Sequence, residues 1–231
     1  MYIYGKNSCY EFLKKSKNVK SLYLEYNFND KKIISLIEKL NVQPSYYKKS
    51  ELDQLANENH QGIIMDVGDY EYCDIDEIIS DNGFIVILDH LEDTHNFGAI
   101  IRTCVAAGVD GIIIPKDRSV KVNSTVMKTS VGTAMNTKIC MVTNLSQTIN
   151  YLKDKGYWIY ASDMNGVSYS SVSYDGSVAI VIGNEGKGVS ELVKKSSDYT
   201  ISIPMNKNCE SLNASVAAGI IIYEVVRQRN S

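Results

Sequence analysis

The sequence lacks several features that would point to particular classes of protein. No stretch comes near the roughly 20 consecutive apolar residues that a membrane-spanning helix needs. The opening residues, MYIYGKNSCYEFLKK, lack the basic-then-apolar order of a signal peptide. Lysine and arginine total 24 against 27 acidic residues, a net charge of −3, so any nucleic-acid surface must be a local patch. We expect a cytoplasmic protein with no membrane partner.

Metal sites, disulfide frameworks and common hydrolase sites also find no support. His60, His90 and His95 have no metal-ligand spacing with one another, and no Ser-His-Asp order or nucleophile elbow is visible. The cysteines contain no C-x-x-C pair, and we expect reduced, structural thiols. They are Cys9, Cys73, Cys104, Cys140 and Cys209. We predict no metal.

What the chain does contain is enough apolar sequence for a sizeable core, since 44% of its 231 residues are hydrophobic. The N-terminal part alternates helix-like pieces with strands and predicts a small α/β or α+β module. Its expected helices are 8–15 and 31–40, and its strands 21–24 and 62–67. An acidic, weakly patterned stretch follows. We therefore predict a domain over residues 1–70, a linker over 71–82 and a larger domain over 83–231.

In the larger domain, short and continuously apolar runs alternate with helical patterns. Strands of this kind, separated by helices, predict a parallel sheet covered on both faces. The expected strands are 84–88, 111–114, 139–142, 158–161, 178–182 and 200–203. The expected helices are 99–107, 123–130, 145–155, 189–195 and 212–229.

Polar residues and glycines follow directly after certain of these strands, which is where ligands bind in open α/β sheets. In LDHLEDTHNFGAIIRTCVAAG, Asn96 and Gly98 open a helix and Arg102 follows within it. Asn96 alone is more simply a helix cap. Arg102 interrupts an otherwise apolar helix, so its guanidinium must reach a carboxylate, a phosphate or water.

A second segment, AIVIGNEGKGVS, runs from a strand into the stretch Gly183 to Gly188. Its glycine spacing matches neither the dinucleotide-binding nor the P-loop pattern, although glycines permit close approach of the backbone to a ligand. A tight turn with a solvated Glu185 explains this local pattern equally well.

The third segment, ISIPMNKNCESLNASVAAGIIIYEVVRQR, contains Ser211 and Asn213 before a long helix. Both residue types are common caps, and Ser211 is well placed as the N-cap. Helical spacing predicts one buried stripe on the helix. It consists of Leu212, Val216, Gly219, Tyr223 and Val226.

The three segments together resemble the SpoU, or TrmH, family of the SPOUT methyltransferases. Asn-x-Gly-x-x-x-Arg, Gly-Asn-Glu-Gly-x-Gly and Ile-Pro-Met followed by SLNASVAAG occur in the family's order. PKDRS at 115–119, with Asn123, and HQG at 60–62 resemble the branch that methylates a guanosine of 23S ribosomal RNA. The resemblance implies S-adenosylmethionine as cofactor, a trefoil knot, a homodimer and an N-terminal RNA-binding domain of L30e-like fold.

The resemblance also assigns the site residues. The backbone groups of Gly183, Ile203 and Leu212 are implied to hold the adenosine of the cofactor. The catalytic set is implied to be Asn96, Arg102, Glu185, Ser211 and Asn213. A ribose 2′-hydroxyl is a weak nucleophile at neutral pH, so attack on a methyl group needs a base or a polarising cation together with in-line placement. Arg102 suits the cation role, because its guanidinium keeps its proton in proteins.

Two other functions stay open at this point. One is a transfer RNA ribose 2′-O-methyltransferase of the same family, with RNA again as the partner and not DNA. The other is an RNA-binding assembly factor that has lost catalysis, against which the intact polar set argues. A Rossmann-type methyltransferase is disfavoured, because no G-x-G loop follows the strand FIVILD.

Overall fold

The computed structural model describes residues 1–15, 19–56, 59–206 and 211–230. These residues form two compact units. One comprises Met1–Glu71 with Val122–Asn136, and the other Tyr72–Lys121 with Thr137–Ser231. In the described part of the chain, no helix is both long and apolar enough to cross a membrane.

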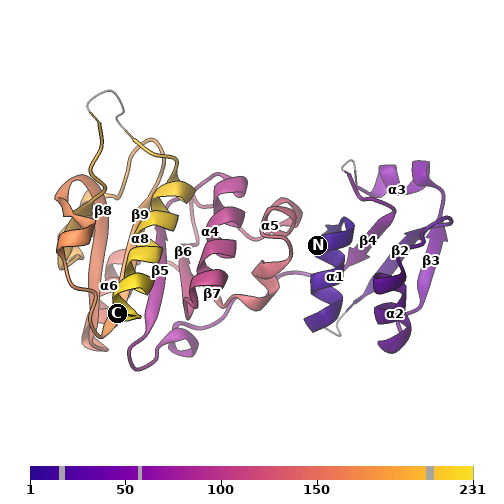
Figure 1. Cartoon of the computed structure of the whole chain (residues 1–231), viewed down its shortest axis with the longest axis horizontal. Coiled ribbons are helices and arrows are strands. Elements are labelled where there is room, and N and C mark those ends of the chain that lie inside the picture. Colours follow the sequence, from indigo (N-terminus) through magenta and orange to yellow (C-terminus); the bar gives the residue numbers. More distant parts are fainter. Residues whose placement is uncertain (16–18, 57–58, 207–210, 231) are drawn as a thin grey trace. The chain divides into compact units, whose positions relative to one another are not determined.

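The first unit is a four-stranded sheet with helices. Its strands are β1 (Tyr2–Tyr4), β2 (Ser21–Glu25), β3 (Pro44–Tyr47) and β4 (Ile63–Asp66), in the order β1-β4-β2-β3. Its helices are α1 (Lys6–Lys15), α2 (Lys31–Lys39) and α3 (Lys49–Leu55) (Figure 1). The α2 helix begins where the Asp30 carboxylate accepts hydrogen bonds from the backbone N–H groups of Lys32 and Ile33. The α/β module is confirmed, although β1, β3 and α3 were missed.

The first unit also contains α5 (Ser124–Thr129) and the 3₁₀ helix η2 (Thr133–Asn136). The α5 helix contacts β1, and the Lys128 Nζ lies 5.2 Å from the centroid of the Tyr4 ring. The sequence pattern placed this segment among the elements of the C-terminal domain. Contacts between residues far apart in the chain decide which unit this segment joins. The local hydrophobic pattern carries no information on such contacts.

The HQG motif is a structural turn in this unit. His60 is buried, accepts a hydrogen bond at Nδ1 from the Gly62 N–H and donates from Nε2 to Asp53. The Gln61 side chain accepts a hydrogen bond from the Lys6 N–H at the start of α1. The motif therefore joins the loop before β4 to the first turn of α1.

The second unit confirms the predicted parallel α/β architecture. Its six strands are all parallel and lie in the order β10-β8-β9-β5-β6-β7. They are β5 (Phe84–Asp89), β6 (Gly111–Pro115), β7 (Ile139–Val142), β8 (Tyr157–Ser168), β9 (Ser177–Gly183) and β10 (Tyr199–Ser202). All six residues of β5 are buried, as expected for a central strand covered on both faces.

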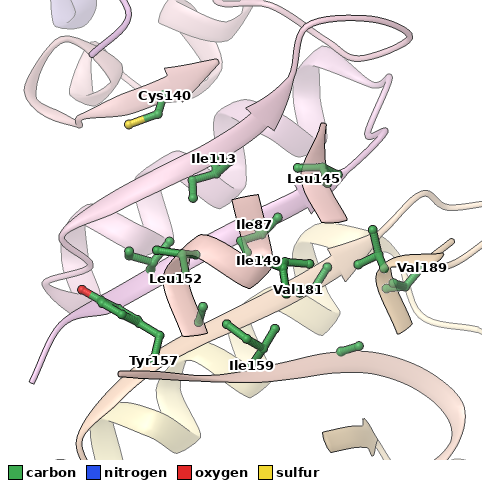
Figure 2. Close-up of a cluster of buried hydrophobic side chains, with 14 of the residues drawn as sticks. Ile87, Ile113, Cys140, Leu145, Ile149, Leu152, Tyr157, Ile159, Val181 and Val189 are labelled. Atoms are coloured by element: carbon green, nitrogen blue, oxygen red, sulfur yellow. The ribbon is translucent and has the colours of Figure 1, made fainter. Parts of the chain in front are cut away.

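Helices cover both faces of this sheet (Figure 1). On one face, α6 (Leu145–Asp154) buries side chains such as Ile149 in a cluster with Ile87 and Val181 (Figure 2). The α7 helix (Glu191–Ser196) adds Val193 to the same cluster. On the other, α8 (Ala214–Arg229) contacts β9 and packs against α4 (Thr94–Ala107). The 3₁₀ helices η1 (Ile75–Ile78) and η3 (Tyr169–Ser171) complete the unit.

The predicted buried stripe of α8 is wrong. Val216 and Tyr223 are each 49% exposed, and the buried apolar residues of the helix are Ala214, Ala218, Ile221, Ile222 and Val225. The helix is apolar over most of its circumference, so spacing alone does not select a face. The small side chains of Ala214 and Ala218 permit close approach, and that decides the packing.

A carboxylate network holds the end of α8. Glu224 is buried and accepts hydrogen bonds from Arg227 and from the Gln228 side chain. Gln228 in turn donates to the Val172 carbonyl and accepts from the Tyr174 N–H. The hydrogen bonds from Arg227 lower the pKa of Glu224 to about 2.

This network predicts a specific loss of stability in acid. The folded pKa of Glu224 lies below its unfolded value, so the unfolded chain binds more protons between about pH 2 and pH 4.5. The stabilisation is present above that window and is lost as the pH falls through it. In Glu224→Gln, denaturant unfolding followed at stepped pH should show a smaller decline over this range. If the free energy of unfolding falls with pH as steeply in Glu224→Gln as in the wild type, Glu224 is not the source of the acid sensitivity.

Candidate functional site

A cavity of about 370 Å³ lies in the second unit, at the carboxyl ends of β9 and β10 and beside the middle of β8. Its walls come from four segments: the middle of β8, the loop after β9, the end of β10 and the start of α8. They are Ser162, Asp163, Met164, Ile182 to Gly188, Ile201, Ser202, Ile203, Met205, Ser211, Leu212, Ala214, Ala217 and Ile221. This is the position at which parallel sheets bind ligands.

The loop after β9 is held by its own asparagine. The backbone groups of Asn184 and Gly188 exchange two hydrogen bonds, and the Asn184 Oδ1 accepts from the N–H groups of Gly186 and Lys187. The Asn184 Nδ2 donates to the His90 carbonyl after β5. A Cβ on Gly183 would lie 2.2 Å from the Gly188 carbonyl carbon, so only glycine fits there. The glycine pattern thus builds a folded rim for the cavity.

The opposite wall is a bulge in β8. The pairing of β8 with β10 shifts register between Thr200, which lies opposite Ala161, and Ile201, which lies opposite Val167. The intervening residues leave the ladder, and Ser162, Asp163 and Met164 line the cavity. The Ser202 Oγ donates to the Gly166 carbonyl at 2.8 Å and fixes the far side of the bulge.

A hydrogen-bonded chain joins the three sequence motifs beside this cavity. The Asn96 Nδ2 donates to the Glu185 Oε1 at 2.7 Å, and the Asn213 Nδ2 donates to the Asn96 Oδ1 at 2.9 Å. Asn213 is also the N-cap of α8, because its Oδ1 accepts from the N–H groups of Ser215 and Val216. Ser211, the expected cap, lies before the helix and lines the cavity. Asp93 caps α4, so Asn96 keeps its side chain for the network.

The structure brings together all the predicted site residues except one. Gly183, Ile203 and Leu212, the predicted cofactor residues, all line the cavity, as do Glu185 and Ser211. Asn96 is linked to the cavity by its hydrogen bond to Glu185, and Asn213 is linked to it through Asn96. Arg102 does not join them.

Arg102 lies on α4, six residues and about 9 Å along the helix axis from Asn96. Its side chain is exposed and makes no hydrogen bond or ion pair within the residues that the structure describes. The sequence context predicts that Arg102 reaches a carboxylate, a phosphate or water. In the structure it faces water. The guanidinium is therefore available to a charged group from outside this unit.

Sequence reasoning missed the residues that support the site. Asp89 is buried at the end of β5, where Oδ2 accepts from the Ser190 N–H at 2.6 Å and Oδ1 lies 2.6 Å from the His90 Nδ1. It therefore ties β5 to the start of α7, just beyond the glycine loop. The sequence offers a signal for Asp89, because it ends the apolar run FIVILD and a carboxylate is rarely buried without a partner.

Asp163, in the β8 wall, was missed as well. Burial raises the pKa of this carboxyl, but the hydrogen bonds from the Asn165 N–H and from Lys194 outweigh it, and the net shift is downward. The cavity wall thus carries an ionised carboxylate at neutral pH. The cavity rim carries a second acid, the exposed Glu185.

Substitutions at Asn213 should separate capping from the polar network. Asn213→Ala removes both and should lower the free energy of unfolding by about 1 kcal/mol. Asn213→Ser retains a capping oxygen and should recover most of that stability, yet it still lacks the donor to Asn96. Denaturant unfolding of both variants, and an assay of the methyl transfer that the sequence resemblance implies, check this. Full activity in Asn213→Ser would show that the contact with Asn96 is dispensable.

Comparisons with known proteins agree with this geometry. Residues 83–223 match the model of the SpoU rRNA methylase family, and residues 2–73 match the model for RNA 2′-O ribose methyltransferase substrate binding. A Bacillus subtilis (strain 168) protein named for the TrmH family of tRNA/rRNA methyltransferases is 38% identical over 239 residues, covering 99% of this chain and 96% of the relative. A Staphylococcus aureus (strain MSSA476) relative named for the same family is 47% identical over 189 residues, which cover 79% of this chain and 76% of the relative.

Solved structures share the fold. The SpoU methyltransferase AviRb from Streptomyces viridochromogenes, in complex with AdoMet, superposes with a TM-score of 0.86 at 23% identity, covering 100% of this chain and 91% of its own. A TrmH/SpoU tRNA modifying enzyme from A. aeolicus is 33% identical with a TM-score of 0.58, covering 67% of this chain and 78% of its own. The chain belongs to the SpoU, or TrmH, family of RNA ribose methyltransferases.

Proposed function

We propose that this protein transfers a methyl group from S-adenosylmethionine to a ribose 2′-hydroxyl in RNA, and that the nucleotide is a guanosine of 23S ribosomal RNA. The observation that carries the proposal is the cavity with the hydrogen-bonded chain Asn213–Asn96–Glu185 at its rim. Its support is that Asn96, Glu185 and Asn213, which lie far apart in sequence, contact one another beside the cavity.

The cavity fits the proposed cofactor in shape and charge. Ile182, Ile201, Leu212 and Ile221 offer an apolar surface to an adenine ring, and Gly183 permits the backbone to approach it. S-adenosylmethionine carries a sulfonium and an ammonium group, and Asp163 and Glu185 supply carboxylates in the cavity lining. When bound, the cofactor supplies an electrophilic methyl group.

The chain's own residues then have distinct proposed roles. Asn96, Ser211 and Asn213 orient the ribose and the bound cofactor, and Glu185 is held in place by its hydrogen bond from Asn96. Arg102, exposed and without a partner in the described part of the chain, places its positive charge beside the 2′-hydroxyl and the adjacent phosphate. It acts through that charge, since a guanidinium holds its proton.

The active unit is proposed to be a homodimer built around α8. The exposed Val216 and Tyr223 leave an apolar face on this helix, and the family resemblance implies a dimer with a trefoil knot in each C-terminal domain. At micromolar concentration, light scattering should give twice the monomer mass of 25.8 kDa. Val216→Asp should shift the protein toward the monomer. A monomeric wild-type protein would rule the dimer out.

The N-terminal domain, residues 1–70, is proposed to have an L30e-like fold and to hold the RNA. Transfer RNA is the competing substrate, because the relatives are named for both RNAs. Deleting the gene and mapping ribose methylation by mass spectrometry should show loss of one 2′-O-methylguanosine from large-subunit RNA. A loss confined to transfer RNA would move the assignment there. No loss, with intact RNA binding, would favour an inactive assembly factor.

A further inference from the structure

The first unit exposes a pair of stacked tyrosines. Tyr26 and Tyr46 are 64% and 52% exposed, and their rings lie 6.3 Å apart with an interplanar angle of 21°. Tyr46 is on the edge strand β3, and Tyr26 follows the end of β2. Large aromatic side chains gain free energy from burial, so two adjacent rings left in solvent indicate a surface that a flat ligand covers.

A cavity of about 360 Å³ lies directly beside this pair, with Tyr46 as one of its walls. It opens between α2 and the β2–β3 edge of the sheet, and its floor is apolar, with Leu24, Ile34 and Ile37. Ligand-binding pockets span roughly 300 to 1,000 Å³. The cavity is therefore of a size suited to a small planar group and not to a folded partner.

Polar side chains complete the lining on one side. Glu38, Asn41 and Gln43 all line the cavity and are exposed. None of the three makes a side-chain hydrogen bond or ion pair within the described residues, so their polar atoms are available to a ligand. Lys31 and Lys32, exposed in the first turn of the same helix α2, supply positive charge for a phosphate backbone.

We propose that this cavity binds one unpaired guanine of the RNA substrate, stacked on Tyr46, the member of the Tyr26–Tyr46 pair that lines the cavity. RNA-binding proteins recognise splayed-out bases by aromatic stacking and by hydrogen bonds to the base edges. Guanine presents N1–H and N2–H donors side by side, which a carboxylate such as Glu38 accepts together, while its O6 accepts from an amide such as Asn41 or Gln43. The proposal rests on RNA being the substrate and assigns a second, non-catalytic contact to it.

Short labelled RNAs on the full-length protein test the base site. Fluorescence anisotropy should show tighter binding of r(UUGUU) than of r(UUIUU), whose inosine lacks the exocyclic amine, or of r(UUAUU). Tyr46→Leu should weaken binding of r(UUGUU) by about tenfold, as for loss of one stacked base. Tyr46→Phe, which retains the ring, should bind nearly as the wild type does. Glu38→Gln should remove the preference for guanine over inosine.

The same variants separate this site from the proposed catalysis. Cofactor affinity, measured by calorimetry, should be unchanged in Tyr46→Leu and Glu38→Gln, because both lie in the first unit. Equal binding of the three RNAs, or unchanged affinity in Tyr46→Leu, would overturn the guanine site and leave methyl transfer untouched. Guanine-selective binding in a protein that methylates no RNA would overturn the proposed function and leave the site standing.

Discussion

Arg102→Ala should lower the rate of methyl transfer by at least about a hundredfold, the usual loss when an essential charge-stabilising group is removed. The exposed side chain contributes no hydrogen bond or ion pair to the fold in the described residues, so the free energy of unfolding should change little. Arg102 is also absent from the cavity lining, and cofactor affinity should be nearly unchanged. Single-turnover transfer, calorimetry and denaturant unfolding measure the three quantities.

Arg102→Lys is the matched control for this result. Lysine keeps the positive charge but lacks the planar, bidentate donor geometry of the guanidinium. If catalysis needs only the positive charge, Arg102→Lys should recover much of the rate of methyl transfer. If the paired contact with the phosphate is needed, the lysine variant should stay slow. Near-normal transfer in Arg102→Ala would remove this residue from its proposed role.

Gly183→Ala should abolish measurable cofactor binding and destabilise the second unit. The added methyl would lie 2.2 Å from the Gly188 carbonyl carbon and 2.3 Å from the Val189 nitrogen, both backbone atoms of the folded loop. Accommodating it requires a backbone shift, which costs about 1 to 3 kcal/mol in a well-packed region. That shift would move the rim of the cavity.

Gly186→Ala is the control in the same loop. Its added methyl would lie 3.6 Å from the Asn184 Oδ1, an ordinary contact. We expect unfolding and cofactor binding close to those of the wild type. Calorimetry and denaturant unfolding of both variants check the pair. Normal cofactor binding by Gly183→Ala would show that this glycine is not needed for the shape of the site.

Much of the fold was predictable because its elements are locally encoded. Continuously apolar strands such as Phe84–Asp89 and helices with clear caps, such as α2 after Asp30, appear where the sequence indicates. The short strand Pro44–Tyr47 was missed because its sequence, Pro-Ser-Tyr-Tyr, has no alternation of apolar and polar residues. The prediction of the buried face of α8 was wrong because the helix is apolar around most of its circumference.

The sequence supplied candidate site residues but not their geometry. Family resemblance supplied the residues, whereas the contact of Asn213 with Asn96 spans 117 positions and no local pattern encodes it. The roles of Asn184 and Asp89 depend on hydrogen bonds between loops that only the folded sheet brings together. Hydrophobic periodicity cannot predict long-range polar networks of this kind.

Transfer of a labelled methyl group is the most direct measurement of the central claim. The purified protein is incubated with methyl-labelled S-adenosylmethionine and with ribosomal or transfer RNA, and the RNA is digested to nucleosides. The account predicts label in a 2′-O-methylated nucleoside, 2′-O-methylguanosine from 23S RNA, and a loss of label in Arg102→Ala. Label on a base instead of the ribose, or an RNA-binding protein that transfers no label to either RNA, would contradict it.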